Sequence, residues 1–279
     1  PTELLKRSRV MPDLEGLAPW PDLSFERPAG SHSLVPAMAE FQAMMDAVRD
    51  GAQNSAPSDI PDDPEERSNH LKAFAYFNDI SMVGIAPLRS DDRLQAPRRN
   101  PQIDRLSHAL QTRQTKTLAA GIDMIMADLR ESMTAKPEPM DHHAYALIFL
   151  VAYRRDPRSG ETGCDWVQDA QAERAALLGA ETATVLANYI RVLGHSARAH
   201  SATTCDVDLA RLAVKAGLAQ VAGDQITHPW LKQRFGLAAV TTDMALAPDL
   251  PLAADQPKSV RMGLDWGLGR HGGASRGSH

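Results

Sequence analysis

The chain has 279 residues, a formal net charge of −5 and 43% hydrophobic residues, so it can bury a sizeable core in one large domain or two small ones. It carries no block of basic residues, which argues against a nucleic-acid-binding surface. Two cysteines in so long a chain do not make a disulfide framework, which favours a reducing, cytoplasmic compartment. The longest apolar run, Ala144–Tyr153, is too short for a membrane span, which needs ~20 residues.

The N-terminal part predicts an arm followed by two helices. Residues 1–33 contain five prolines and little hydrophobic periodicity, so they form either an extended arm pinned by Trp20 and Phe25 or a mobile tail. A helix is expected from Leu34 to Arg49, with the apolar stripe Met38, Phe41, Met45 and Val48. A second helix is expected from Pro64 to Asn78, with Leu71, Phe74 and Phe77 facing inward.

The next stretch predicts a short strand, a loop and a long helical region. Ile80–Ala86 has the composition of a strand that ends at Pro87. Arg89–Pro101 is expected to be a loop, whose arginines either bind a phosphate or a carboxylate or, more commonly, are solvated. Residues 102–134 are expected to be helical, with the stripe Leu118, Ile122, Ile125 and Leu129.

Ala144–Tyr153 is apolar at every residue, which predicts a strand in the middle of a sheet that helices cover on both faces. A long alanine-rich helix is expected from about Asp165 to Leu193. The residues expected to face the sheet are Leu177, Leu178, Val185, Leu186 and Ile190. These elements predict an α/β (α+β) fold with a mixed central sheet flanked by helices.

From Gly194 onward the sequence predicts a series of short strands and one short helix. Gly194 suits a left-handed helix cap, and Ala197–Ser201 alternates as a half-buried strand does. Asp206 is expected to cap a helix over Val207–Ala216, and Gly217 to stop it. A hairpin with its turn at residues 222–224 and a strand over residues 237–242 follow.

Several histidines and cysteines could bind a metal or act in catalysis, but each also has a structural explanation. His142 and His143 are adjacent, so on a strand they would point to opposite faces and not share a metal, and a position at the surface or in a loop is favoured. His195, His200 and Cys205 match no zinc spacing, which favours structural roles. Cys164 begins a helix, where a thiol can be activated, but no matched histidine motif accompanies it.

Five motifs in order resemble the reductive dehalogenases, enzymes that use cobalamin and iron–sulfur clusters to remove halide from organohalides. The matching stretches are Tyr189–Gly194, Ser196–His200, Ala213–Leu218, Leu237–Asp243 and Ala247–Pro251. The resemblance runs from about Ile80 to the end, and it is greatest to the cytoplasmic, catabolic type, which carries two related cobalamin-domain-like copies. It implies a nitroreductase-like fold, as in cobalamin-processing proteins. The expected organisation is an arm over 1–33, a cobalamin-domain-like unit over 34–255, and a disordered or truncated tail over 256–279.

Two departures from the family pattern suggest a degenerate copy. Cobalamin-binding copies are glycine-rich after the helix, where backbone approaches the macrocycle, but residues 217–223 read GLAQVAG. An iron–sulfur cluster needs about four closely spaced cysteines, and this chain has only Cys164 and Cys205. The expected function is therefore an N-terminal, non-catalytic module of a reductive dehalogenase. Its expected partner is the C-terminal corrinoid and iron–sulfur half, in the same enzyme or in a second chain, and no catalytic residue is assigned.

The alternative is a free-standing cobalamin-binding or cobalamin-handling protein. Its candidate cofactor-binding residues are Ser201 and Thr203 at a strand end, together with Gly217 and Gly223. This location agrees with the preference of ligands for the carboxyl ends of strands in open α/β sheets. No metal-ligating residue is assigned.

Overall fold

The computed structural model describes residues 4–23, 32–112, 139–167 and 170–256. Phe25, the predicted stripe at 118–129 and the tail from 257 lie outside the described residues. The helices are α1 (Val35–Ala47), α2 (Pro64–Phe77), α3 (Gln102–Thr112), α5 (Cys164–Val167), α6 (Gln171–Val192) and α7 (Leu209–Lys215), with a 3-10 turn, η2, at Ser90–Asp92. The strands are β1 (Met82–Pro87), β2 (Arg93–Arg98), β3 (Tyr145–Ala152), β4 (Ala197–His200), β5 (Cys205–Val207), β6 (Gln220–Ala222), β7 (Gln225–Thr227) and β8 (Phe235–Thr242).

A four-stranded sheet in the order β1-β3-β8-β4 forms the centre of the molecule. The predicted apolar strand is β3, and it lies between β1 and β8, as expected. All three pairings are antiparallel, so the expectation of a mixed sheet was wrong in strand direction, although the α+β class is confirmed. Helices cover both faces, so an antiparallel strand here is apolar on both sides. No described helix is long and apolar enough to cross a membrane.

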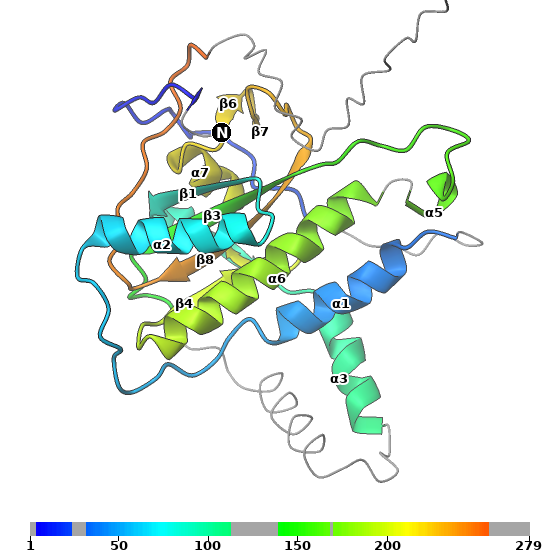
Figure 1. The fold of residues 1–279 in the computed structure, drawn as a ribbon, viewed down its shortest axis with the longest axis horizontal. Coiled ribbons are helices and arrows are strands. Elements are labelled where there is room, and N and C mark those ends of the chain that lie inside the picture. The colour runs from blue at the N-terminus through cyan, green and yellow to red at the C-terminus, as the bar shows by residue number, and fades with distance from the viewer. Residues whose placement is uncertain (1–3, 24–31, 113–138, 168–169, 257–279) are drawn as a thin grey trace, which may run out of the picture.

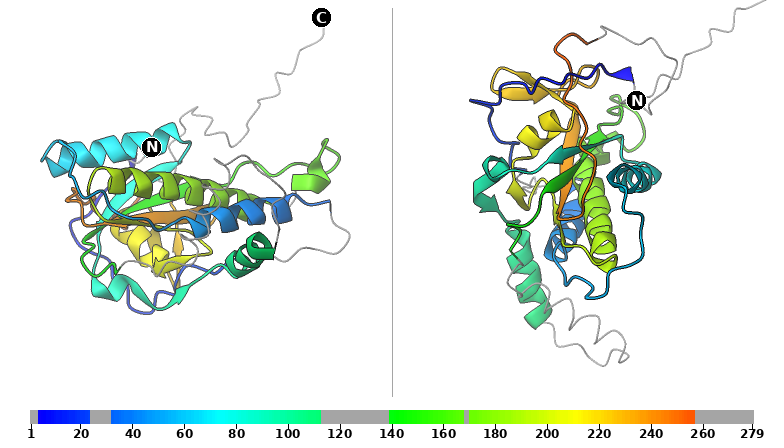
Figure 2. Two further views of the ribbon diagram at one scale, coloured as in Figure 1. Left: turned by 90° about the horizontal axis from the view of Figure 1, so that it is seen from below. Right: turned by 90° about the vertical axis from the view of Figure 1, so that its left-hand side faces the viewer.

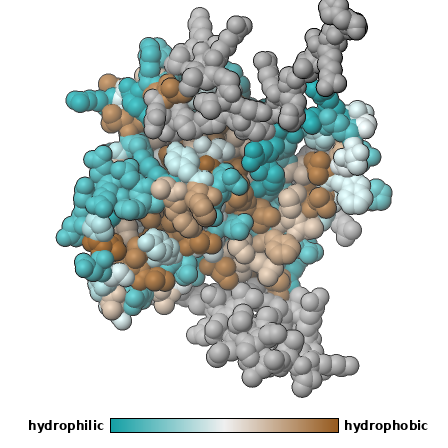
Figure 3. Space-filling view, viewed as in Figure 1, coloured by the Kyte–Doolittle hydropathy of each residue, from teal (hydrophilic) through white to brown (hydrophobic). Residues whose placement is uncertain are grey.

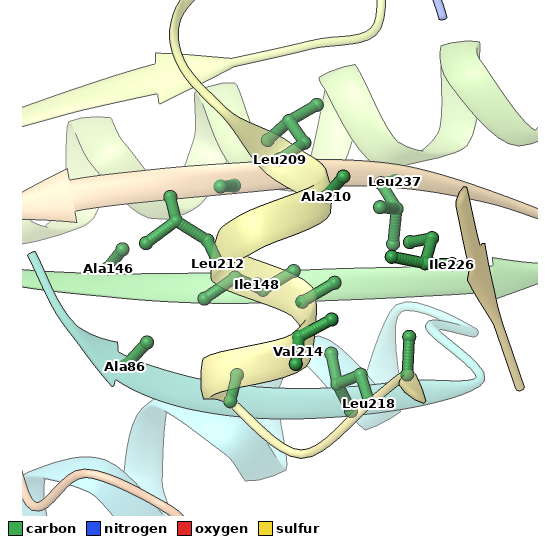
Figure 4. Packing of buried hydrophobic residues seen from close by; sticks show 14 of the residues in the cluster. Ala86, Ala146, Ile148, Leu209, Ala210, Leu212, Val214, Leu218, Ile226 and Leu237 are labelled. Atoms are coloured by element: carbon green, nitrogen blue, oxygen red, sulfur yellow. The ribbon is translucent and has the colours of Figure 1, made fainter. Parts of the chain in front are cut away.

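The side chains of β3 alternate between two hydrophobic cores. Ile148 and Leu150 lie in the core beneath α7, with Leu212 and Leu237 (Figure 4). Alternate residues of β3, including Phe149, lie in the other core, which α2 and α6 cover. Figures 1 and 2 show these helices and α7 on opposite faces of the sheet. Each large side chain buried in this way contributes ~1.5–3 kcal/mol to stability.

Small residues let the helices approach the sheet closely. A Cβ at Gly179 of α6 would lie 2.8 Å from the Ala238 Cβ, and a Cβ at Gly236 of β8 would lie 2.9 Å from the Ala175 Cβ. On the other face, a Cβ at Gly84 would lie 2.5 Å from the Ala216 carbonyl oxygen. These distances are shorter than van der Waals contact, so glycine is needed at each position.

We expect Gly84→Ala to lower the free energy of unfolding by ~1–3 kcal/mol, because it overpacks a tight contact. The obstacle is a backbone carbonyl, so Ala216→Gly in the same chain should restore little. In Gly179→Ala the obstacle is the Ala238 methyl group, which Ala238→Gly should relieve. Urea unfolding of the single and double variants measures these differences. An unchanged midpoint for Gly84→Ala would contradict the close approach of β1 and α7.

The main errors of the sequence prediction concern which face of a helix is buried. Phe41, Phe77 and Val185, expected to face inward, are exposed. The buried positions of α1 are Ala39, Gln42, Ala43, Asp46 and Ala47, and alanines dominate the buried positions of α6. Because α1 packs along α6 (Figure 1), the contact selects small side chains and leaves the large apolar ones outside.

Three local predictions also fail. The expected loop at 89–101 contains β2, which pairs with β5 in a separate two-stranded sheet. The residue that caps α7 is Asp208, whose side chain accepts from the Ala210 and Arg211 amides, whereas Asp206 lies within β5. The strand expected to be half-buried, β4, is buried throughout.

The described part of the N-terminal arm lies on the domain. The Trp20 ring stacks on Phe235 with centroids 5.3 Å apart, as the pinned-arm alternative predicts. The Ser8 amide donates to the Pro251 carbonyl at 2.9 Å, and Leu5, Leu14 and Leu17 are buried. Residues near the two ends of the described chain therefore lie side by side.

Candidate functional site

Ser201 and Thr203 lie just after β4 and surround a buried carboxylate. Asp46, near the end of α1, accepts from the Ser201 hydroxyl at 2.6 Å and from the Thr203 hydroxyl at 2.5 Å. The amides of Asn100 and Gln42 also donate to it, at 2.8 and 3.1 Å. Four donors thus compensate one buried charge, and both hydroxyl protons are committed within the protein.

Sequence reasoning found the two hydroxyl residues but missed their partners. Gln42 and Asp46 are spaced four apart and share a helix face with Ala39 and Ala43. This polar pair, aligned with small residues, could have identified the buried face of α1. The stripe that contains Met38 and Met45 is more hydrophobic, and it predicts a different face.

Gly217 and Gly223 are not part of this cluster. Gly217 follows α7 with a φ of 68°, a conformation that favours glycine. The guanidinium of Arg7 lies against it, and a Cβ at Gly217 would stand 1.7 Å from the Arg7 Nη1. This nitrogen donates to the carbonyls of Gly217 and Leu250, each at 2.8 Å. Gly223 lies in the β6–β7 turn, with no heavy atom near the position of an added Cβ.

A polar cleft of about 430 Å³ opens beside β4. One wall is the segment from Asp50 to Pro57, and the other includes His142, Ser196 and Arg198. The segment reaches the cleft by capping the end of α6: the Asn54 and Ser58 amides donate to the carbonyls of Arg191 and Leu193, each at 3.0 Å. The volume lies within the ~300–1,000 Å³ range of small-molecule sites.

Two histidines connect this cleft to the interior. The His143 ring bonds Ser196 Oγ at 2.9 Å and Thr241 Oγ1 at 2.8 Å, and the Thr241 hydroxyl bonds His200 Nε2 at 2.9 Å. The Asp206 amide donates to His200 Nδ1 at 3.3 Å. The bonds therefore run in one direction: His200 donates to Thr241, Thr241 to His143, and His143 to Ser196.

The electrostatics keep both rings neutral. Burial, helped by positive neighbours, lowers the pKa of His143 to about 4, and it lowers the pKa of His200 well below its ordinary value. Arg198 and Arg49 pair with the nearby carboxylates: Arg198 Nε lies 2.6 Å from Asp50, and Arg49 Nη1 lies 2.8 Å from Asp206. The series of hydrogen bonds from His200 to Ser196 is therefore neutral at pH 7, and each ring nitrogen in it has a partner. Such a network is suited to fixing the end of the sheet rather than to acid–base chemistry.

The remaining sequence candidates do not form a metal site. Across the part of the chain that the structure describes, no group of three or more histidine, cysteine, aspartate or glutamate residues could hold an ion. The Cys205 thiol donates to the Val207 carbonyl, and burial raises its pKa to about 12, so it stays protonated. Cys164 begins the four-residue helix α5 and is partly exposed. His143, expected at the surface or in a loop, does lie in the loop before β3 but is buried.

Comparison with known proteins gives matches among solved structures. No protein-family model matches the chain, and no curated protein sequence does. The catabolic reductive dehalogenase NpRdhA matches with 33% sequence identity and a TM-score of 0.67, over 91% of this chain and 30% of that one. A structure described as suggesting a mechanism for B12-dependent dehalogenation matches with 32% identity and a TM-score of 0.68, over 93% and 31%. NpRdhA in complex with 3-bromo-4-hydroxybenzoic acid matches at 31% identity. This chain therefore spans about 30% of the length of these proteins.

Proposed function

Because this chain belongs to the reductive dehalogenase family over the 30% of those proteins that it matches, we propose that it is the N-terminal module of such an enzyme. The complete enzyme would remove halide from organohalides with cobalamin and iron–sulfur clusters, and this module would not itself carry the chemistry. Its role would be to pack against the corrinoid and iron–sulfur half. The cofactor named for one relative, B12, would bind in that half.

The arrangement beside Gly217 carries this proposal. A corrin ring needs open space against exposed backbone at this segment, as the resemblance implies. Here the Arg7 guanidinium and the Leu250 carbonyl fill that space. The described residues around Gly217 therefore do not fit cobalamin, and no step of a dehalogenation is derived through them.

The strand-end hydroxyls support the same conclusion. Ser201 and Thr203 donate to Asp46 in a buried cluster. A ligand that needed their protons would remove two of the four donors to that buried carboxylate, which is costly. The alternative of a free-standing cobalamin-handling protein gains no comparable support, because Gly217 is obstructed and Gly223 lies in a different turn.

Titration of the purified chain with hydroxocobalamin tests the proposal. Binding would be monitored by absorbance and calorimetry, with NpRdhA as the positive control. We expect this chain to show no binding up to high micromolar concentrations of hydroxocobalamin. Arg7→Ala should be measured in parallel, since it removes the main obstruction at Gly217. Tight one-to-one binding by the unaltered chain, with a spectral change, would contradict the proposal and favour a cobalamin-handling function.

A further inference from the structure

The outer side of α1 and α6 is an apolar surface. We define the α1–α6 face by five residues of these two packed helices that are between 37% and 59% exposed: Phe41, Met44, Val185, Tyr189 and Val192. The three α6 residues are spaced four and three apart, so they form one stripe. Figure 3 shows apolar side chains gathered over α1 and α6 on this side of the molecule.

The size of this face suits a protein interface. A fully exposed aromatic side chain presents ~150–250 Å², so five large residues near half exposure present on the order of 400 Å². A specific interface covers ~800 Å² on each partner, of which rather more than half is apolar. The α1–α6 face would thus supply most of the apolar part of one such interface.

The charges around the face distinguish between possible occupants. Glu40 and Glu181 are the exposed charged residues of α1 and α6, and both are acidic. A second copy of the chain docked here would bring acidic groups together, which disfavours self-association. An apolar surface with basic residues at its rim is the complementary partner.

We propose that the α1–α6 face docks onto the part of a reductive dehalogenase that this chain does not match. The relatives are more than three times the length of the matched region, so their remaining part is large enough to supply a surface with apolar residues and a basic rim. This inference rests on the proposed function, since it locates the surface by which the module would contact its partner.

Cysteine labelling can test the surface without disturbing the fold. Val185→Cys and Tyr189→Cys would each be placed in a chain that also carries Cys164→Ser, so that buried Cys205 is the remaining native thiol of the isolated chain. In the hybrid, which also contains the iron–sulfur cysteines, labelling would be read at the introduced position. Each variant would be labelled with a maleimide twice: in the isolated chain, and in a hybrid of NpRdhA whose matched part is replaced by this chain. Val10→Cys, which alters an exposed residue outside the face, is the matched control.

We expect labelling at positions 185 and 189 to be at least tenfold slower in the cobalamin-loaded hybrid than in the isolated chain, with no change at position 10. Equal rates at 185 and 189 in a hybrid that retains cobalamin would overturn the docking surface alone. A hybrid that does not fold or does not retain cobalamin would overturn the proposed module function and this inference with it. Protection at 185 in an isolated chain that sediments as a dimer would identify a second copy as the occupant, and would also overturn the proposal.

Discussion

Asp92→Ala should lower the free energy of unfolding by ~3–5 kcal/mol, because it leaves a buried lysine without its counter-ion. Asp92 is 0% exposed, and Lys215 is buried at the end of α7. The lysine Nζ lies 2.6 and 2.7 Å from the two carboxylate oxygens. Asp92 Oδ2 also accepts from the Arg89 amide at 2.9 Å. The pair therefore joins η2 to α7, and chemical denaturation should show the loss as a lower midpoint.

Two variants make this prediction specific. Asp91→Ala removes the neighbouring, exposed carboxylate that pairs with Arg211 at 3.1 Å, and an exposed pair contributes ~0–1 kcal/mol. Adding Lys215→Met to Asp92→Ala removes the stranded charge and should recover much of the loss. Equal costs for Asp91→Ala and Asp92→Ala would show that burial does not set the strength of this pair.

Elements with strong local signals were predictable from the sequence. The run at 144–153 identifies β3 because each of its residues is apolar, whichever face it lies on. The β6–β7 hairpin follows from Gly223, whose φ is 66°, and Gly194, with a φ of 93°, ends α6 as expected. In each case a few neighbouring residues determine the structure.

Features that depend on distant contacts were not predictable. β2 has little strand character and forms because β5, about 110 residues later, pairs with it. The inward face of α1 is set by its contact with α6, which accepts Ala39 and Ala43 but not Phe41. Hydrophobicity alone selects the stripe that contains Phe41, which is exposed. The other residues of the same stripe are only half-buried: Met38, Met45 and Val48.

In the candidate site, too, the local features were predictable and the contacts between distant residues were not. That Ser201 and Thr203 lie together at the end of a strand follows from their spacing, since the chain turns directly after β4. Their partner, Asp46, is 155 residues from Ser201, and no local pattern connects the two. The obstruction of Gly217 by Arg7 is likewise a contact between sequence positions 210 apart.

Glu173→Gln should increase stability progressively as the pH rises from about 4.5 to about 8, and have little effect in acid. Glu173 of α6 is 1% exposed, and neither carboxylate oxygen has a hydrogen-bond partner among the described residues. Burial, with a smaller contribution from Asp46, raises its pKa to about 8. In the unfolded chain the group ionises near pH ~4.3. Between these values the unfolded state releases a proton that the folded state keeps, so rising pH favours unfolding.

The expected difference follows from this linkage. Urea unfolding should give similar free energies for the unaltered chain and Glu173→Gln near pH 4.5. The variant should gain progressively through neutral pH, reaching on the order of 3–5 kcal/mol above pH 8. Glu181→Gln, an exposed change on the same helix, is the control and should give parallel curves. The buried histidines, whose lowered pKa values destabilise the fold in acid, are common to all three proteins, so their contribution cancels in the comparison. If Glu173→Gln also ran parallel to the unaltered chain from pH 5 to 9, Glu173 would have to be ionised and solvated in the folded state.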